Sequence, residues 1–75
     1  MTLDEAPAGI PVTLQRPDLP IARGRRLAEL GLRPGAVVTV VRRTTGGGRI
    51  VAVGPARVAL GRETLRRIAV TEVAA

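Results

Sequence analysis

The sequence predicts a mainly β fold in which about five short strands and two short helices form a small barrel. The first observation behind this prediction is length, because 75 residues allow one domain with a compact core. The second is the absence of aromatic residues and cysteine, so valine, isoleucine, leucine and alanine must fill that core. The third is a series of short runs of β-branched residues separated by glycine and proline, a pattern typical of strands joined by tight turns.

The N-terminal part of the chain is expected to contribute little to this fold. Residues 1–11 contain Pro7, Gly9 and Pro11 among small residues, which predicts a flexible leader that packs little. The domain itself is expected over residues 12–75. Its first strand is Val12–Leu14, which the turn-forming residues 16–20 cut short, so we expect this strand at an edge or at the rim of the sheet.

A helix of about two turns is expected to follow and to end at Leu30. Leu27 and Leu30 share one face of this helix, and Arg23 would join that face. Gly24 weakens the first turn. Either the regular helix begins after Gly24, or Arg23 reaches outward along its aliphatic stem.

The residues after this helix redirect the chain into a strand. Gly31 can take the left-handed conformation that closes a helix, and Leu32 just beyond it can pack back onto Leu27. Pro34 and Gly35 suit the two corners of a turn whose second corner requires a positive backbone angle. The valine-rich run that comes next is therefore expected to be a strand.

The remainder of the chain is predicted to be an antiparallel meander that closes the barrel. Its expected strands are residues 36–43, 49–53 and 57–60, its loops are residues 44–48 and 54–56, and a second short helix covers residues 62–67. The alternating run 68–73 is expected to return, to pair with the first strand and to remove the open edges of the sheet. This arrangement is an SH3-like barrel.

The charged residues favour an anionic partner. All twelve basic residues are arginine, and with six acidic residues they give a net charge of +6 at pH 7. Three doublets could cluster on one side of so small a body and bind an acidic surface or phosphates: Arg25–Arg26, Arg42–Arg43 and Arg66–Arg67. The alternative is that these arginines form a solvated face that keeps an apolar-rich domain soluble.

The residue inventory argues against metal binding and catalysis. With no histidine or cysteine and with scattered carboxylates, the sequence predicts no metal site, no cofactor and no pair of nucleophile and general base. Gly46–Gly48 leads into a strand instead of a helix, so it is not expected to be a phosphate-binding loop. The chain has neither a signal peptide nor an apolar run long enough to cross a bilayer, and we expect a cytoplasmic, non-enzymatic protein.

The leucine, leucine-glycine and proline-glycine series at fixed spacing resembles the FeoA family, small cytoplasmic proteins that accompany the ferrous iron transporter FeoB. The residues that carry the resemblance lie within residues 12–73: Leu27, Leu30, Gly31, Pro34, Gly35, Val38, Val40, Val51, Val53, Val58–Leu60 and Ile68–Val70. Two segments depart from the family pattern. Many relatives have a proline and an acidic residue in the loop at residues 44–48, and this chain has neither there. At Gly61–Arg62, relatives often have two basic residues, and this chain has only one.

The resemblance implies an SH3-like domain of a kind that also occurs at the C-terminus of DtxR-type repressors. It further implies an adaptor that contacts the cytoplasmic GTPase region of FeoB and modulates ferrous iron uptake. We expect the motif residues Leu27, Leu30, Gly31, Pro34 and Gly35 to build the fold, whereas the candidate partner-binding residues are Arg25, Arg26, Arg42 and Arg43.

Two other functions remain open from the sequence. One is a basic SH3-like module that binds nucleic acid, although the chain offers no aromatic platform on which single-stranded bases could stack. The other is a detached regulatory domain of a metal-dependent repressor, which the absence of a helix-turn-helix segment disfavours.

Overall fold

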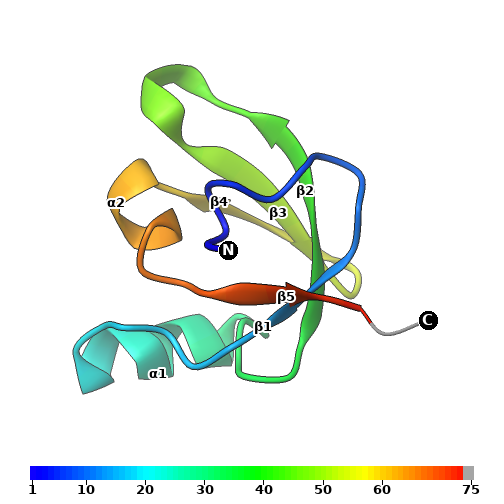
Figure 1. The fold of residues 1–75 in the computed structure, drawn as a ribbon. Coiled ribbons are helices and arrows are strands. Elements are labelled where there is room, and N and C mark those ends of the chain that lie inside the picture. The colour runs from blue at the N-terminus through cyan, green and yellow to red at the C-terminus, as the bar shows by residue number, and fades with distance from the viewer. Residues whose placement is uncertain (74–75) are drawn as a thin grey trace.

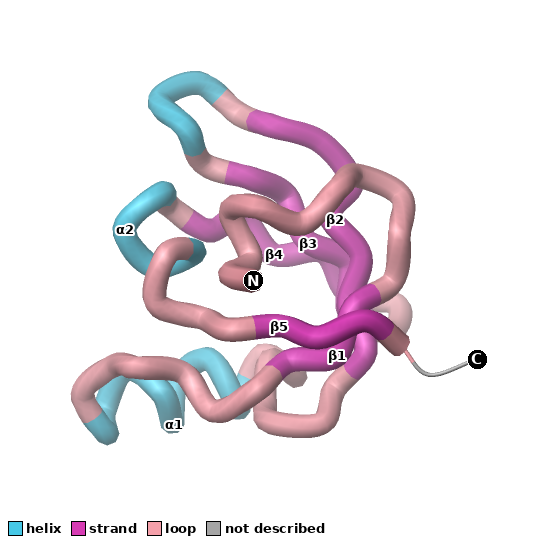
Figure 2. The backbone as a smooth tube through the Cα atoms, viewed as in Figure 1, coloured by secondary structure: helices cyan, strands magenta, loops and turns pink. Residues whose placement is uncertain are grey.

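The fold consists of one antiparallel sheet and two short helices (Figures 1 and 2). The computed structural model describes residues 1–73, so Ala74 and Ala75 of the predicted domain lie outside the described residues. The elements, in chain order, are β1 (Val12–Leu14), α1 (Ile21–Glu29), β2 (Val37–Arg43), β3 (Arg49–Val53), β4 (Ala56–Leu60), α2 (Arg62–Leu65) and β5 (Val70–Glu72), with a 3-10 turn at Thr45–Gly47. The predicted fold class, mainly β with two short helices, is confirmed.

The strands lie in the order β4-β3-β2-β1-β5, and every neighbouring pair is antiparallel. As predicted, the last strand returns to the first, with Thr13 opposite Thr71. The predicted edge position of β1 is wrong, because β1 pairs with β2 on its other side. The prolines at positions 17 and 20 lie beyond the strand, so neither of them removes a backbone donor from β1 itself.

The expectation that β5 removes the open edges of the sheet is also wrong. Among the described residues, β4 pairs only with β3, and β5 pairs with no strand other than β1. The start of β5 is instead covered by the N-terminus: the Val70 N–H donates to the Met1 carbonyl oxygen at 2.8 Å, and the Leu3 N–H donates to the Ile68 carbonyl oxygen at 2.8 Å. One edge of the sheet is therefore partly covered, whereas at the other edge β4 has no second strand partner among residues 1–73.

The N-terminal residues are part of the folded body, which corrects the expectation that residues 1–11 pack little. The side chains of Leu3 and Ala6 are buried in the core. The Gly9 N–H donates to the carbonyl oxygen of Val40, and Arg49 donates to that of Ala6. The physical reason is that a core without aromatic rings needs additional aliphatic side chains to fill it, and this segment supplies them.

The core lies on the inner face of the curved sheet. Alternation along β2 buries Val38 and Val40, which lie opposite Val53 and the fully buried Val51 of β3. A register shift at Val41 bends the strand at this point. The other buried aliphatic side chains come from the N-terminal segment, β1, α1 and the C-terminal part: Leu3, Ala6, Val12, Leu14, Leu27, Leu32, Leu60, Leu65, Ile68 and Val70.

The turn after α1 has the geometry that the sequence predicts. Gly31 has a φ of +96°, and the Leu32 N–H donates to the Leu27 carbonyl oxygen at 2.9 Å, which closes the helix. Gly35 has a φ of +89°, and the Ala36 N–H donates to the Arg33 carbonyl oxygen at 3.0 Å across the Pro-Gly corner. These two turns bring the chain from α1 directly into β2.

Candidate interaction site

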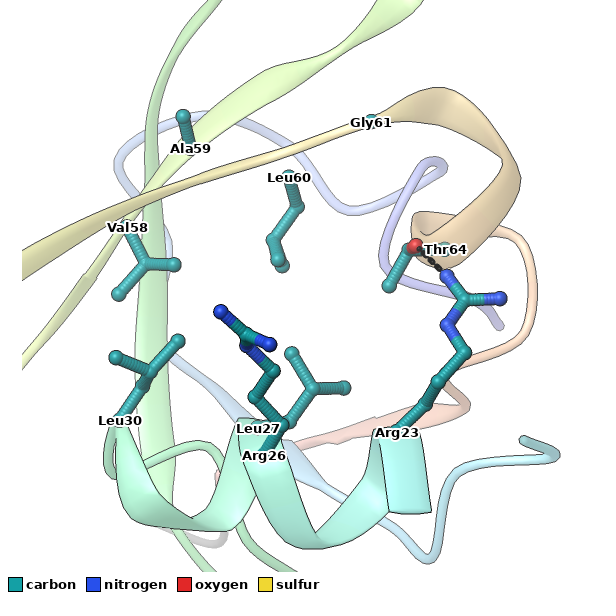
Figure 3. Close-up of a pocket in the computed structure, with 9 residues that line it drawn as sticks. All are labelled: Arg23, Arg26, Leu27, Leu30, Val58, Ala59, Leu60, Gly61 and Thr64. Atoms are coloured by element: carbon teal, nitrogen blue, oxygen red, sulfur yellow. Dashed lines mark hydrogen bonds between the residues drawn. The ribbon is translucent and has the colours of Figure 1, made fainter. Parts of the chain in front are cut away.

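A pocket of about 240 Å³ lies between α1, the edge strand β4 and the start of α2 (Figure 3). On this side, β4 pairs with no further strand in the described part of the chain. Nine residues line it: Arg23, Arg26, Leu27, Leu30, Val58, Ala59, Leu60, Gly61 and Thr64. Residues from α1, β4 and α2 therefore meet at this place.

The helix α1 forms one wall of the pocket. Its first residue decides between the two alternatives that the sequence left open, a start after Gly24 or an outward-reaching Arg23. It begins at Ile21, immediately after Pro20, and includes Gly24. Proline before the first helical residue fits the backbone there because its fixed φ suits a helix start. The alternative that holds is the second, in which Arg23 extends outward: its guanidinium donates to the Thr64 hydroxyl at 2.7 Å.

The walls of the pocket are aliphatic. Leu27 and Leu60 are buried, Val58 is partly buried, and Leu30 is 47% exposed. In Figure 3 these side chains point toward one another from α1 and β4. An engineered apolar cavity of about 150 Å³ is enough to bind benzene, so a pocket of this size has room for one large apolar side chain.

Two arginines stand at the mouth of this apolar space. Arg26 extends from α1 toward β4, between Leu30 and Arg23 (Figure 3). Both Arg23 and Arg26 are exposed, and the hydrogen bond to Thr64 fixes the position of Arg23. A guanidinium group binds carboxylates well because it offers several donors in one plane. The arrangement is thus suited to an apolar group flanked by negative charge.

The four candidate arginines do not lie together. Arg25 and Arg26 belong to α1, but only Arg26 lines the pocket. Arg42 and Arg43 are the last residues of β2, and Figure 1 shows that end of the strand at the opposite side of the molecule from α1. These two doublets therefore do not cluster on one side, because the seven-residue strand β2 separates them.

In the third doublet, Arg67 forms two ion pairs. The Arg67 guanidinium lies 3.1 Å from the Glu63 carboxylate, one helical turn away, and 4.0 Å from the Asp18 carboxylate. These contacts lie at the exposed surface, where such pairs contribute little to stability.

The motif residues divide into two groups. Leu27 is buried, and Gly31, Pro34 and Gly35 form the two turns described above. Leu30 caps α1, and nearly half of it remains exposed at the pocket. The turn at Gly31 places Leu30 where the core ends, so this side chain extends the apolar surface outward.

Several residues of the pocket were not singled out from the sequence. The helical spacing puts Arg23 on the same face of α1 as Leu27 and Leu30. This spacing could have identified Arg23 as a residue of the pocket. Val58 is one of the residues that carry the family resemblance, but no sequence signal shows that Val58 or Thr64 approaches α1, because this depends on the curvature of the sheet and on the path of the chain into α2.

Other kinds of site are not found in the described part of the chain. Within residues 1–73, no three His, Cys, Asp or Glu side chains lie close enough together to hold a metal ion. None of the helices described has the length and apolar character that crossing a membrane requires.

Solved structures with this fold include iron-transport proteins and repressors. The FeoA protein from Chlorobium tepidum is 29% identical, with a TM-score of 0.89 over 99% of this chain and 71% of that one. FeoA from Stenotrophomonas maltophilia, solved with zinc and described as an SH3 domain protein that possibly acts as a ferrous iron transport activating factor, is 36% identical, with a TM-score of 0.76 over 93% and 88% of the two chains. A manganese-dependent transcriptional repressor is 25% identical, with a TM-score of 0.84 over 97% of this chain and 41% of that one.

A comparison with curated protein sequences gives no match. The model of the FeoA domain, by contrast, matches residues 1–72 and so includes the N-terminal segment that packs into the core. Because this match spans almost the whole chain, and because the SH3-like fold is that of solved FeoA proteins, the chain belongs to the FeoA domain family.

Proposed function

We propose that this protein is a cytoplasmic, non-enzymatic regulator of ferrous iron transport that binds the cytoplasmic GTPase region of a FeoB-type transporter. The observation that carries the proposal is the pocket between α1 and β4 in a member of the FeoA family. Its aliphatic walls and its two arginines are suited to a protein surface, because partner interfaces combine a buried apolar anchor with a polar rim.

The distribution of charge supports a partner of opposite sign. The chain carries a net charge of +6, and Arg23 and Arg26 stand at the pocket. Complementary charge accelerates association and selects among partners more than it adds affinity. The transporter surface that docks here is therefore expected to present carboxylates around an apolar side chain.

The four arginines predicted from the sequence enter this proposal unequally. Arg26 is assigned to the contact because it lines the pocket. Arg25 lies on the same helix but does not line it, so it serves as a matched control. Arg42 and Arg43 would contact the transporter only if the interface extended to the far end of β2.

The test is association of the purified chain with the purified cytoplasmic region of the transporter, at low salt, with and without guanine nucleotide. We expect binding that Arg26→Ala weakens and that Arg25→Ala leaves nearly unchanged. The double change of Arg42 and Arg43 to alanine decides whether the β2 end takes part. Absence of association in both nucleotide states would overturn the proposed function.

A further inference from the structure

We propose that the pocket recognises an extended acidic segment of its partner, which adds to the sheet as a new strand beside β4 and inserts one apolar side chain between α1 and β4. This inference rests on the proposed function for the identity of the partner, but its geometry comes from the sheet edge alone. The edge strand supports the backbone pairing, the pocket supports the insertion of an apolar side chain, and the charges support the acidic character of the segment.

The backbone of β4 offers free hydrogen-bonding groups beside the pocket. Val53 lies opposite Ala56 across a two-residue turn at Gly54–Pro55, and such flanking residues form a hydrogen-bonded pair. Because these pairs alternate along an antiparallel ladder, the peptide groups of Arg57 and Ala59 point away from β3. Among the described residues, neither of these groups takes part in a backbone hydrogen bond outside the sheet.

The pocket lies along the same edge, which gives the added strand its specificity. Val58 and Leu60 of β4 and Leu30 of α1 line the pocket, and Ala59 lies at its rim (Figure 3). In strand addition, main-chain hydrogen bonds supply affinity and pockets for alternate side chains supply selectivity. One apolar side chain of the incoming strand would occupy this space, and its neighbours two residues away would lie on the same face.

The charges indicate an acidic segment and argue against a second copy of this chain. Arg23 and Arg26 stand on the α1 side of the pocket, and the exposed Arg57 lies on the edge strand itself. If two copies paired through β4, these positive charges would lie side by side along one edge, and like charges across strands are destabilising. Carboxylates two residues before and after the apolar side chain would instead share its face and meet the guanidinium groups of Arg23 and Arg26, whereas Arg57 adds only to the positive field of the edge.

The probe is a capped peptide with the sequence Thr-Glu-Thr-Leu-Thr-Glu-Thr, titrated into the isotope-labelled chain and followed by NMR. The glutamates and the leucine share one face of this peptide when it is extended. We expect shifts concentrated at Arg57, Ala59 and Leu30. Shifts absent from β4, or concentrated at the far end of β2, would overturn the inference.

Two modified peptides test whether the backbone pairs. One carries an N-methyl group on the leucine amide, and the other carries it on the amide of the threonine that follows. Successive amides of a strand point to opposite sides, so one methyl group should weaken binding by about tenfold and the other should have little effect. Equal binding by both peptides would contradict strand addition.

A charge swap tests the role of Arg26. Arg26→Glu should bind the peptide at least several-fold more weakly and should bind better a matched peptide in which lysine replaces both glutamates. Arg25→Glu, on the same helix but away from the pocket, is the control for net charge. If both variants lost the same amount of affinity for the peptide, only the net positive charge of the chain, and not Arg26 at the pocket, would attract it.

The last variant separates this inference from the proposed function. Ala59→Pro removes the outward-facing N–H and leaves the ladder with β3 intact, and proline is tolerated at sheet edges. Its fold is verified by the amide spectrum of β2. If the transporter region binds the unmodified chain and Ala59→Pro equally well, strand addition is wrong while the proposed function stands. If only the peptide binds, the pocket is correctly described and the transporter is not its partner.

Discussion

The guanidinium of Arg49, on β3, donates a hydrogen bond to the backbone carbonyl oxygen of Ala6, 43 residues away in the sequence. Arg49 is 8% exposed, the one charged side chain among the buried residues of the described part of the chain. The contact attaches the N-terminal segment to the central sheet. It makes residues 1–11 a structural part of the domain.

Replacing this arginine should destabilise the protein. Arg49→Met keeps much of the aliphatic volume but leaves the Ala6 carbonyl oxygen without its donor, and an unpaired buried polar group costs about 1–3 kcal/mol. Urea unfolding measures the loss. Arg57→Met, at an exposed position, is the control and should change the free energy of unfolding by less than about 0.5 kcal/mol. Equal effects of the two changes would show that the contact with Ala6 does not contribute.

Replacing Leu3 of the N-terminal segment by alanine should also lower the stability of the fold. Leu3 is 0% exposed, and removing a fully buried leucine side chain typically costs about 2–5 kcal/mol. Leu3→Ala is therefore expected to lower the thermal midpoint clearly. Ile10→Ala, in the same segment but 52% exposed, should have a much smaller effect. A negligible change for Leu3→Ala would mean that the segment does not pack as described.

Replacement by alanine should change the free energy of unfolding in opposite directions at Gly31 and at Gly24. Gly31 has a φ of +96°, and an added Cβ would lie 3.4 Å from a methyl group of Val53, so Gly31→Ala should destabilise by about 1–2 kcal/mol. Gly24 lies inside α1 with nothing within 4 Å of an added Cβ, so Gly24→Ala should stabilise by about 0.5–1 kcal/mol. Chemical denaturation of both variants checks the signs. Two changes of the same sign would contradict the geometry of α1 and its end.

The N-terminal turn should have a measurable dependence on pH. The backbone N–H of Thr2 and its hydroxyl donate to the Glu5 carboxylate at 2.9 and 2.8 Å, and these bonds, the backbone one first, hold the pKa of Glu5 below its usual value. Because this pKa is lowered on folding, the contribution of Glu5 to stability is present above the pKa of the unfolded chain. It is lost as the pH falls through the lower value of the folded chain. NMR titration of the Glu5 side chain, in the folded and the urea-unfolded chain, gives both values, and equal values would refute the prediction.

Much of the fold follows from local sequence signals. The bounds of β1 and β3 agree with the prediction because prolines and glycines limit these runs of aliphatic residues on both sides. The end of α1 just before Gly31 was predictable because Gly31 supplies the positive φ that closes the helix. By contrast, Leu3 and Ala6 are isolated apolar residues without periodicity, so no local pattern indicates that they belong to the core.

The site was less predictable than the fold for a physical reason. Arg26 stands out in the sequence by its charge, but its place at the pocket results from the approach of α1 to β4, which are 27 residues or more apart in the sequence. The arginines at positions 42 and 43 look equivalent to it in the sequence, yet β2 carries them to the other end of the molecule. The density of arginines along the sequence does not distinguish these positions, because it does not show which arginines lie close together in the folded chain.

The most direct test of the account is an NMR titration of the labelled chain with the cytoplasmic region of the FeoB-type transporter. We predict that amide signals around the pocket, above all those of Arg26, Leu30 and Ala59, shift or broaden, while those of Arg42 and Arg43 change little. An unchanged spectrum, or changes confined to the far end of β2, would contradict the assignment of the pocket between α1 and β4 as the surface that binds the transporter.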